Sequence, residues 1–296
     1  MKTQTKAFLL LLIAAVLWSF GGLLIKSVRW NPMAIAGVRS AISVLVLLAV
    51  IRKKHFTFSF SQIAGAVFYA ATMITFVCAN KLTTAANAII LQYTAPIYVA
   101  LLGIWLLKEK VQPYDWIVIV CAILGIGLFF IDKVSIGNQW GNILALISGI
   151  TFAFMIVFLR MQKDSHPISS VFMGNVLTAV LMIPFAFHAV PRDCNSWIAL
   201  FVLGVFQLGL SYILYSMAIK NATALEGVLV PLLEPVLNPL WVLVFLGEKP
   251  TQWAFIGGSI VIASLVLHAQ IKTRQMASNQ NMGTAYSTFH SKMPPE

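Results

Sequence analysis

Charged residues are scarce in this sequence, and acidic ones are the scarcest. Only 10% of the 296 residues are charged, with nine Asp and Glu against twenty Lys and Arg. A soluble domain carries about 25% charged residues, so this chain has too few ionic groups to cover a water-exposed surface. Because 59% of the residues are hydrophobic, the composition indicates an integral membrane protein.

Patterns typical of metal, redox and nucleotide sites are missing as well. The cysteines Cys78, Cys121 and Cys194 have no CxxC or Cys/His spacing, and the five histidines are scattered at segment ends and in loops. This predicts no metal site, no redox pair and no disulfide. No P-loop or other nucleotide motif occurs. We therefore expect no cofactor and find no support for direct ATP drive.

The formal charge of +11 does not indicate a nucleic-acid-binding protein. The basic residues do not form an amphipathic surface or alternate with base-stacking aromatics. They lie in short clusters between apolar runs, as membrane topology requires. With the N-terminus in the cytoplasm, thirteen Lys and Arg would lie inside and six outside. This bias predicts a multi-pass protein of the cytoplasmic membrane with both termini cytoplasmic.

Ten apolar segments predict an all-α polytopic membrane protein with ten transmembrane helices. The runs are continuously apolar and near twenty residues long, whereas barrel strands would alternate and be about half that length. The first run is too long for a typical signal peptide and is expected to be retained. The segments cover 7–27, 32–51, 62–81, 84–107, 113–131, 139–160, 167–189, 195–219, 223–246 and 251–271. Residues 272–296 are polar and are expected to be a disordered cytoplasmic tail.

An internal repeat divides these segments into two groups of five. A shift of 139 residues overlays the run ending at Pro96 on the run ending at Pro235, and aligns Glu109 with Glu248. A nearby shift aligns Pro32 with Pro167. Five helices per repeat, an odd number, force the second repeat to enter the membrane upside down. Such inverted repeats are typical of secondary transporters whose substrate site lies near the midplane.

These motifs resemble the EamA family of the drug/metabolite transporter superfamily. The resemblance covers residues 7–271 and rests on L-W-S-F-G at 17–21, Arg39, T-T-A-A-N-A-I-I-L-Q-Y-T-A-P at 83–96, L-K-E-K at 107–110 and L-E-P-V-L-N-P-L-W…G-E-K at 233–249. It implies one EamA repeat over residues 1–136 and a second over 137–271. It also implies a central cavity lined by helices one to four and six to nine.

Glu234 is the most unusual residue because it interrupts an apolar segment. A carboxyl group at the membrane centre costs about 2.5–3.5 kcal/mol on insertion scales. Asn238 and Trp241 follow at i+4 and i+7 and share its helix face. An acid, an amide and an indole facing one cavity would hold a cationic or amine-bearing solute. Alternatively the acid takes up a proton, because burial disfavours its charged form, or it bonds backbone groups freed by prolines.

Arg39 is the one arginine placed within an apolar run. It is predicted to form a gating or structural ion pair with an intramembrane acid, and the alternatives are a substrate carboxylate or a place nearer the interface. Glu109 is expected to form local salt bridges at the end of its helix. Pro231, Pro235 and Pro239 predict a kinked or unwound helix nine, serving as a pivot or as a fixed wall of the cavity.

Further polar and aromatic residues are candidates for the cavity, although such side chains equally often form interhelical hydrogen bonds or pack. Gln207 and Tyr215 belong to an i, i+4, i+8 stripe on helix eight, and Tyr69 begins a looser one on helix three. The further candidates are Asn87, Gln92, Tyr93 and Trp18.

The leading hypothesis is a secondary transporter that moves a small polar organic solute by alternating access. An amino acid satisfies both Glu234 and Arg39. The alternative is uptake of a cationic, choline-like amine. The expected partners are the solute and the lipid bilayer, and the protein itself is expected to be a monomer or a weak homodimer. An intramembrane enzyme would need a nucleophile with a base, a metal cluster or paired acids, and a channel would need a ring of charge or a filter. Neither pattern occurs.

Overall fold

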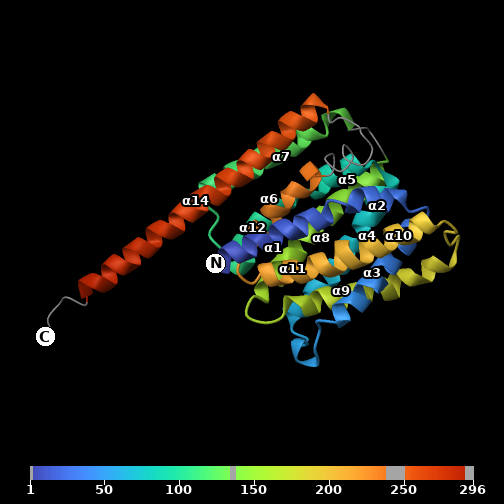
Figure 1. The fold of residues 1–296 in the computed structure, drawn as a ribbon, viewed down its shortest axis with the longest axis horizontal. Helices are drawn as coiled ribbons and strands as arrows, with labels where there is room; N and C mark the ends of the chain where they lie inside the picture. The colour runs from blue at the N-terminus through green and yellow to red at the C-terminus, as the bar shows by residue number, and fades with distance from the viewer. Residues whose placement is uncertain (1–2, 134–137, 238–250, 291–296) are drawn as a thin grey trace.

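The fold is described by a computed structural model over residues 3–133, 138–237 and 251–290, and all regular structure in these ranges is helical (Figure 1). We number the ten predicted segments 1 to 10. Segment 1 is α1 (Thr3–Trp18) with α2 (Gly21–Ser27), segment 2 is α3 (Pro32–Leu48), and segment 3 is α4 (Phe60–Leu82). Segment 4 is α5 (Ala85–Gln92) with α6 (Ala95–Leu102) and a π-helical turn (Gly103–Leu107). Segment 5 is α7 (Pro113–Phe129).

The second half repeats this plan. Segment 6 is α8 (Gln139–Met161), and segment 7 is α9 (Pro167–Met182) with a 3-10 turn (Ile183–Phe187). Segment 8 consists of α10 (Cys194–Val202), a π-helical stretch (Leu203–Leu210) and α11 (Ser211–Ala218). Segment 9 starts with α12 (Ala224–Leu229) and a 3-10 turn (Val230–Leu232), and segment 10 is the first part of α14 (Gln252–His290). Segment 9 is helical again over 233–237, where its described part ends.

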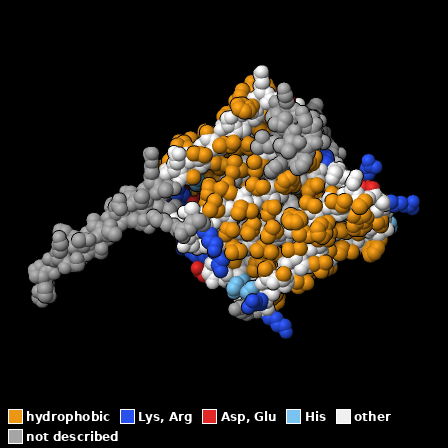
Figure 2. Space-filling view, viewed as in Figure 1, with side chains coloured by type: hydrophobic (Ala, Val, Ile, Leu, Met, Phe, Trp, Pro, Cys, Tyr) orange, Lys and Arg blue, Asp and Glu red, His pale blue; other side chains and the backbone are white. Residues whose placement is uncertain are grey.

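The described helices suit a membrane. Seven helical spans are long and apolar enough to cross one, and Pro32–Leu48 and Pro113–Phe129 are shorter apolar helices. Apolar side chains cover most of the bundle face in Figure 2, as expected for a surface in contact with lipid. The expectation of an all-helical polytopic membrane protein is therefore confirmed.

Helix starts follow local sequence signals. A proline occupies the first turn of α3, α7 and α9, where its missing N–H costs no hydrogen bond. Asn31 caps α3 by accepting from the Ala34 N–H at 2.7 Å, and Thr84 caps α5 by accepting from the Asn87 N–H at 3.0 Å. These caps fix where each helix leaves its short connection.

Helix packing repeats between the two halves. Segment 3 packs on segments 6 and 7, and segment 8 packs on segments 1 and 2 in the same way. Segment 4 contacts segment 6, as segment 9 contacts segment 1. Segments 2 and 7 contact each other, and so do segments 5 and 10, whose helices α7 and α14 lie side by side at one edge of the bundle (Figure 1). Two five-segment repeats related by a two-fold axis would give this pattern of contacts.

The C-terminal region differs from the expectation. Residues 272–290 were expected to be disordered, yet α14 continues through them to His290 and projects beyond the bundle (Figure 1). The physical reason is that no proline occurs between segment 10 and Pro294, and the single glycine in that stretch, Gly283, does not end the helix. A helix already formed by membrane packing extends at little nucleation cost when no breaker stops it.

Candidate functional site

A small cavity lies at the centre of the bundle, where segments from both halves meet. Its volume is about 30 Å³, which is room for one or two water molecules, whereas ligand pockets usually span about 300–1,000 Å³. The conformation is therefore closed around the cavity. The lining residues are Trp18, Arg39, Thr72, Met73, Phe76, Gln92, Tyr93, Phe152, Gln207, Tyr212 and Glu234.

The acidic side of the cavity is built on the kink of segment 9. The Tyr93 hydroxyl lies 2.6 Å from Glu234 Oε2 and 3.1 Å from the Pro231 carbonyl oxygen. Pro235 has no N–H, so the Pro231 carbonyl lacks its usual helical donor. The same relation holds one turn earlier, where the Tyr215 hydroxyl donates at 3.0 Å to the Gly227 carbonyl that Pro231 leaves free. A tyrosine hydroxyl thus lies within hydrogen-bond distance of each carbonyl freed by a proline, and the Tyr93 hydroxyl has its single proton to divide between Pro231 and Glu234.

The basic side is Arg39, a fully buried guanidinium with neutral partners. It donates to Gln207 Oε1 at 3.3 Å and to the Met73 carbonyl oxygen at 3.4 Å. Its Nε atom is buried and has no hydrogen-bond partner among the described residues. Because a buried charge is costly unless paired, this site is incomplete as it stands.

Arg39 and Glu234 line the same cavity without forming an ion pair with each other or with any described residue. The expected ion pair of Arg39 is therefore not formed in the described part of the chain. The ion pairs that the described residues do form are Glu109–Arg160, Asp115–His268 and Glu226–Lys272. A cavity with an acid and a base that are not paired can take a ligand carrying both charges.

An aromatic wall completes the cavity. The Trp18 ring centroid lies 4.9 Å from that of Tyr212, 5.2 Å from Tyr215 and 6.2 Å from Phe152. The Trp18 indole N–H donates to Ser211 Oγ at 2.8 Å, and this bond fixes the ring plane. Rings held in place beside an acid provide faces for a cationic group.

Six of the predicted residues line this cavity, and three other described ones do not. Asn87 lies at the start of segment 4 and donates to Asn142 Oδ1 at 3.2 Å. Tyr69 accepts from Asn175 Nδ2 at 2.8 Å, and Tyr215 bonds the backbone of segment 9 as described above. These three are tied to neighbouring segments instead. Asn238 and Trp241 fall outside the described residues.

Tyr212 lines the cavity and is absent from the residues predicted from the sequence. The stripe Gln207, Ser211, Tyr215 assumed an α-helix, but residues 203–210 are π-helical. The hydrogen bonds of a π-helix run from i to i+5 instead of i to i+4, so the wider turn rotates the residues that follow it away from the α-helical register, and Tyr212 lines the cavity together with Gln207. Phe152 and Phe76 also line it, together with Thr72 and Met73. Apolar runs rich in such residues carry no signal that separates cavity from packing.

Ion pairs close the bundle at the end where α1 begins, which we call the N-terminal end. Arg160 donates to Glu109 Oε1 at 2.9 Å and to the Lys220 carbonyl oxygen at 2.8 Å. The second oxygen of Glu109 accepts from the Ala224 N–H at 2.9 Å, at the first turn of α12. Glu109 thus joins segment 4 to segments 6 and 9, in place of the local lysine pairs that were expected.

Lysine-to-carbonyl bonds hold the opposite end. Lys26 donates to the Thr83 carbonyl oxygen at 2.9 Å, and Lys81 donates to the Val28 carbonyl oxygen at 2.6 Å. These two bonds cross between segments 1 and 3 in both directions. Contacts between segments therefore fasten the described part of the bundle at both ends.

The fold and the cavity together define a class of protein: a polytopic helical membrane protein with a closed central site between two repeats, as in secondary transporters. The model of the EamA-like transporter family matches the chain twice, over residues 5–131 and 139–269. The chain belongs to this family.

Characterised and uncharacterised transporters are similar to the chain. An uncharacterised transporter of Archaeoglobus fulgidus is 23% identical over 87% of this chain and 94% of its own length. The threonine/homoserine exporter RhtA of Escherichia coli strain K12 is 24% identical over 78% and 80%. Human solute carrier family 35 member G1 is 23% identical over 86% and 76%. A solved crystal structure covers 88% of this chain and 96% of its own, with a TM-score of 0.75 at 19% identity, which shows a shared fold.

Proposed function

We propose that this protein is a secondary transporter of amino acids or closely related metabolites. The observation that carries the proposal is the cavity lined by an acid, Glu234, and a base, Arg39, neither of which forms an ion pair with a described residue. An α-amino acid presents an ammonium group and a carboxylate, and each would meet the opposite charge. The amino acid exporter RhtA among its relatives agrees with this choice. No catalysis is expected.

Binding of such a solute would complete the bonds that the cavity leaves open. Its carboxylate would accept from the free Nε–H of Arg39, which also lies against Gln207. Its ammonium group would face Glu234, with Trp18 and Tyr212 beside it. Because the closed cavity holds only water-sized groups, the solute must enter through a conformation in which one end of the bundle has opened. Alternating access would provide this conformation.

A proton on Glu234 would change how the kink of segment 9 is held. The Tyr93 hydroxyl has one proton and two acceptors within reach, the Glu234 carboxylate and the Pro231 carbonyl. While Glu234 is ionised, the hydroxyl donates to the carboxylate. Once Glu234 is protonated, its own O–H can donate to the Tyr93 oxygen, and the hydroxyl is free to donate to Pro231. Proton uptake would thus alter the backbone support of the kink, which is a route to proton coupling.

The first test is Glu234→Gln in proteoliposomes loaded with a panel of amino acids. Removing the charge should lower saturable counterflow at least about ten-fold, because the ammonium group loses its counter-charge in a low-dielectric site. Asp164→Asn, a change of charge in an exposed loop, is the matched control and should keep full flux. Unchanged flux in Glu234→Gln would refute the assignment.

The second test concerns the coupling ion. If Glu234 carries a proton through the cycle, uptake of solute should acidify the liposome lumen, and a pH gradient should drive accumulation. Glu234→Gln should abolish the proton movement while leaving protein insertion intact. Transport indifferent to the pH gradient would remove proton coupling and leave a carrier driven by the solute gradient.

A second candidate function is the uptake of a cationic, choline-like amine. The aromatic wall of Trp18, Phe152 and Tyr212 next to Glu234 favours it, because ring faces bind quaternary ammonium groups. The two candidates separate at Arg39. Arg39→Met should abolish transport of an amino acid and leave transport of an amine without a carboxylate.

We place the protein in the cytoplasmic membrane with both termini inside. The N-terminal end of the bundle, with Arg160, Lys220 and Lys272, would then face the cytoplasm, in keeping with the excess of basic residues there. Breaking the Glu109–Arg160 pair would accompany opening toward the cytoplasm. A cysteine-accessibility scan of loop residues on intact cells would test this orientation.

A further inference from the structure

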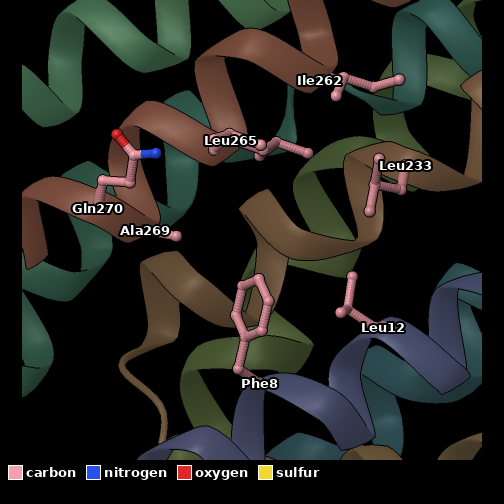
Figure 3. A pocket seen from close by; sticks show the side chains of 8 residues that line it. Phe8, Leu12, Leu233, Ile262, Leu265, Ala269 and Gln270 are labelled. Carbon is pink, nitrogen blue, oxygen red and sulfur yellow. The ribbon is translucent and has the colours of Figure 1, made fainter. Parts of the chain in front are cut away.

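A groove of about 530 Å³ lies on the outside of the bundle, separate from the central cavity. Two helices form its walls and segment 9 closes it on the third side. In Figure 3, Phe8 and Leu12 come from α1, while Ile262 and Gln270 lie toward opposite ends of the groove on α14. The remaining lining residues are Leu233, Leu265, Val266 and Ala269.

Both walls of the groove are membrane-spanning. α1 lies within the span Thr3–Ser27, and the α14 residues lie within the span Gln252–Lys272. Seven of the eight lining side chains are apolar, and Ile262 and Val266 are 44% and 48% exposed. An occupant at this depth must be apolar, because water would find almost no polar partners there. The volume falls in the range of about 300–1,000 Å³ typical of ligand sites.

One end of the groove is polar and basic. Gln270 is exposed there, Lys272 follows two residues later on α14, and Lys6 precedes Phe8 by two residues on α1. Lys6 is exposed. Lys272 Nζ forms an ion pair with Glu226 Oε1 at 2.9 Å, and 23% of the Lys272 side chain is exposed. Figure 2 shows Lys and Arg side chains beside the place where α14 leaves the bundle. The groove is thus apolar along its length, and the charged residues beside its mouth, Lys6, Lys272 and Glu226, carry a net charge of +1 (two positive charges and one negative) without lining the groove themselves.

We propose that this groove binds an anionic phospholipid from the leaflet at the N-terminal end. One acyl chain lies between α1 and α14, and the headgroup phosphate lies near Lys6, Lys272 and the Gln270 amide. Charge complementarity selects an anionic lipid over a zwitterionic one. The acyl chain of the lipid packs on Leu233, the neighbour of Glu234, so the bound lipid supports the kinked segment 9 from outside the bundle. The proposal does not depend on which solute the central cavity takes.

The test is native mass spectrometry of the full-length protein released from detergent with added phosphatidylglycerol or phosphatidylcholine. Ile262→Trp fills the groove, and Ile256→Trp is its matched control, since Ile256 is 46% exposed on the same helix and does not line the groove. Retained phosphatidylglycerol should fall at least about five-fold in Ile262→Trp, because chain packing in the groove is lost. It should be unchanged in Ile256→Trp.

The headgroup contact has its own variant. Lys6→Gln should weaken phosphatidylglycerol binding about five-fold, as expected for one basic residue near an anionic headgroup. Lys163→Gln, an exposed lysine at the end of segment 6, should leave it unchanged. Equal retention of the two lipids, or equal retention by both Trp variants, would overturn the proposal. A wild-type dimer that becomes a monomer in Ile262→Trp would overturn it too, because the groove would then hold a second copy of the chain.

Discussion

Segment 3 is attached to segment 6 in the same way as segment 8 is attached to segment 1. The shift of 139 residues aligns Thr72 of segment 3 with Ser211 of segment 8. Each hydroxyl donates to the carbonyl four residues earlier in its own helix. Each also meets the first segment of the opposite half, Thr72 through Thr151 Oγ1 at 3.0 Å and Ser211 through the Trp18 indole at 2.8 Å. The repeat therefore conserves the way segments 3 and 8 are fastened.

The side chains around these shared contacts differ between the halves. Gln207 contacts Arg39, whereas its counterpart Phe68 stacks on Phe154 with ring centroids 4.7 Å apart. The counterpart of Arg39 under the shift of 135 is Gly174, and an added Cβ there would lie 2.7 Å from Tyr69 Cδ1. One interface is closed by tight packing, and the other carries a buried cation. The contacts that both halves share hold the bundle together, whereas residues without an equivalent in the other half, such as Arg39 and Gln207, form the site.

The largest effect is expected from removing the buried charge of Arg39, which has no charged counterpart in the second half. Arg39→Met should lower amino acid counterflow at least about 100-fold, because the solute carboxylate loses its charged partner. Thermal stability should stay equal or rise, because a buried charge without a counter-ion is replaced by an apolar side chain. Flux and the denaturation midpoint in detergent measure the two effects separately.

The matched change on the packed side should give the opposite result. Gly174→Ala should destabilise the protein by about 1–3 kcal/mol through overpacking, because the new methyl group would also lie 2.8 Å from the Ala66 carbonyl oxygen. Solute affinity of the folded fraction should be unchanged. If Arg39→Met destabilised the protein as Gly174→Ala does, Arg39 would be a packing residue and the two interfaces would be equivalent.

A smaller effect is expected at the second asymmetric pair. The halves align Tyr93 with Leu232 and Ala95 with Glu234, so the Tyr93–Glu234 hydrogen bond has no counterpart. Tyr93→Phe keeps the ring and removes the donor, which should lower the transport rate about ten-fold, since a hydrogen bond to a charged group contributes about 1.5–3 kcal/mol.

Tyr98→Phe is the control for Tyr93→Phe. Tyr98 is half-buried two residues beyond Pro96 on the same segment and does not line the cavity. Initial rates of counterflow at saturating solute would measure both variants. Equal rates in the two would mean that the hydroxyl of Tyr93 only supports the Pro231 carbonyl without acting on Glu234.

The helical segments could be predicted from the sequence more completely than the residues that line the cavity. Continuous apolar runs predicted the segments, because a membrane allows little other than helices. Glu234 and Arg39 were found because ionised groups in such runs are costly. Tyr212 could not be found, because a π-helical stretch shifts the register and leaves no mark in the pattern of apolar residues. Asn238 and Trp241 remain predictions.

The position of Tyr215 follows from the prolines of segment 9. Each internal proline frees the carbonyl four residues earlier, so Pro231 and Pro235 predict two acceptors in need of donors. A tyrosine hydroxyl is a suitable donor, and Tyr215 and Tyr93 have this role. The sequence does not say which tyrosine also meets Glu234, because that depends on how segments 4 and 9 cross.

The ion pair at the N-terminal end should have a moderate effect. Glu109→Gln keeps an oxygen for the Ala224 N–H and removes the charge that Arg160 contacts. A double-mutant cycle with Arg160→Gln should give a coupling of about 1–2 kcal/mol in thermal stability, as for a partly buried charge-assisted bond. A coupling near zero would mean that the pair is no stronger than an exposed salt bridge, and that this end is held by backbone contacts.

The smallest effect is expected at the helix caps of the two equivalent segments, Ser59 for segment 3 and Asp193 for segment 8. Asp193 accepts from the Ser196 N–H at 2.9 Å, and bonds from the Ser196 side chain and backbone hold the pKa of its carboxyl below the ordinary value. A lowered pKa in the folded state adds stability above the unfolded value of about 3.9, and this is lost as pH falls through the folded pKa.

Asp193→Ser should therefore lower the denaturation midpoint slightly at pH 7, and the difference from wild type should shrink as the pH falls below the unfolded value of about 3.9 and through the lower folded pKa. Ser59→Ala removes an uncharged cap, so its difference from wild type should be the same across this pH range. Thermal scans of the purified protein across this pH range would measure both. An Asp193→Ser difference that does not change with pH would show that this cap acts through hydrogen-bond geometry and not through charge, which would make the two caps equivalent after all.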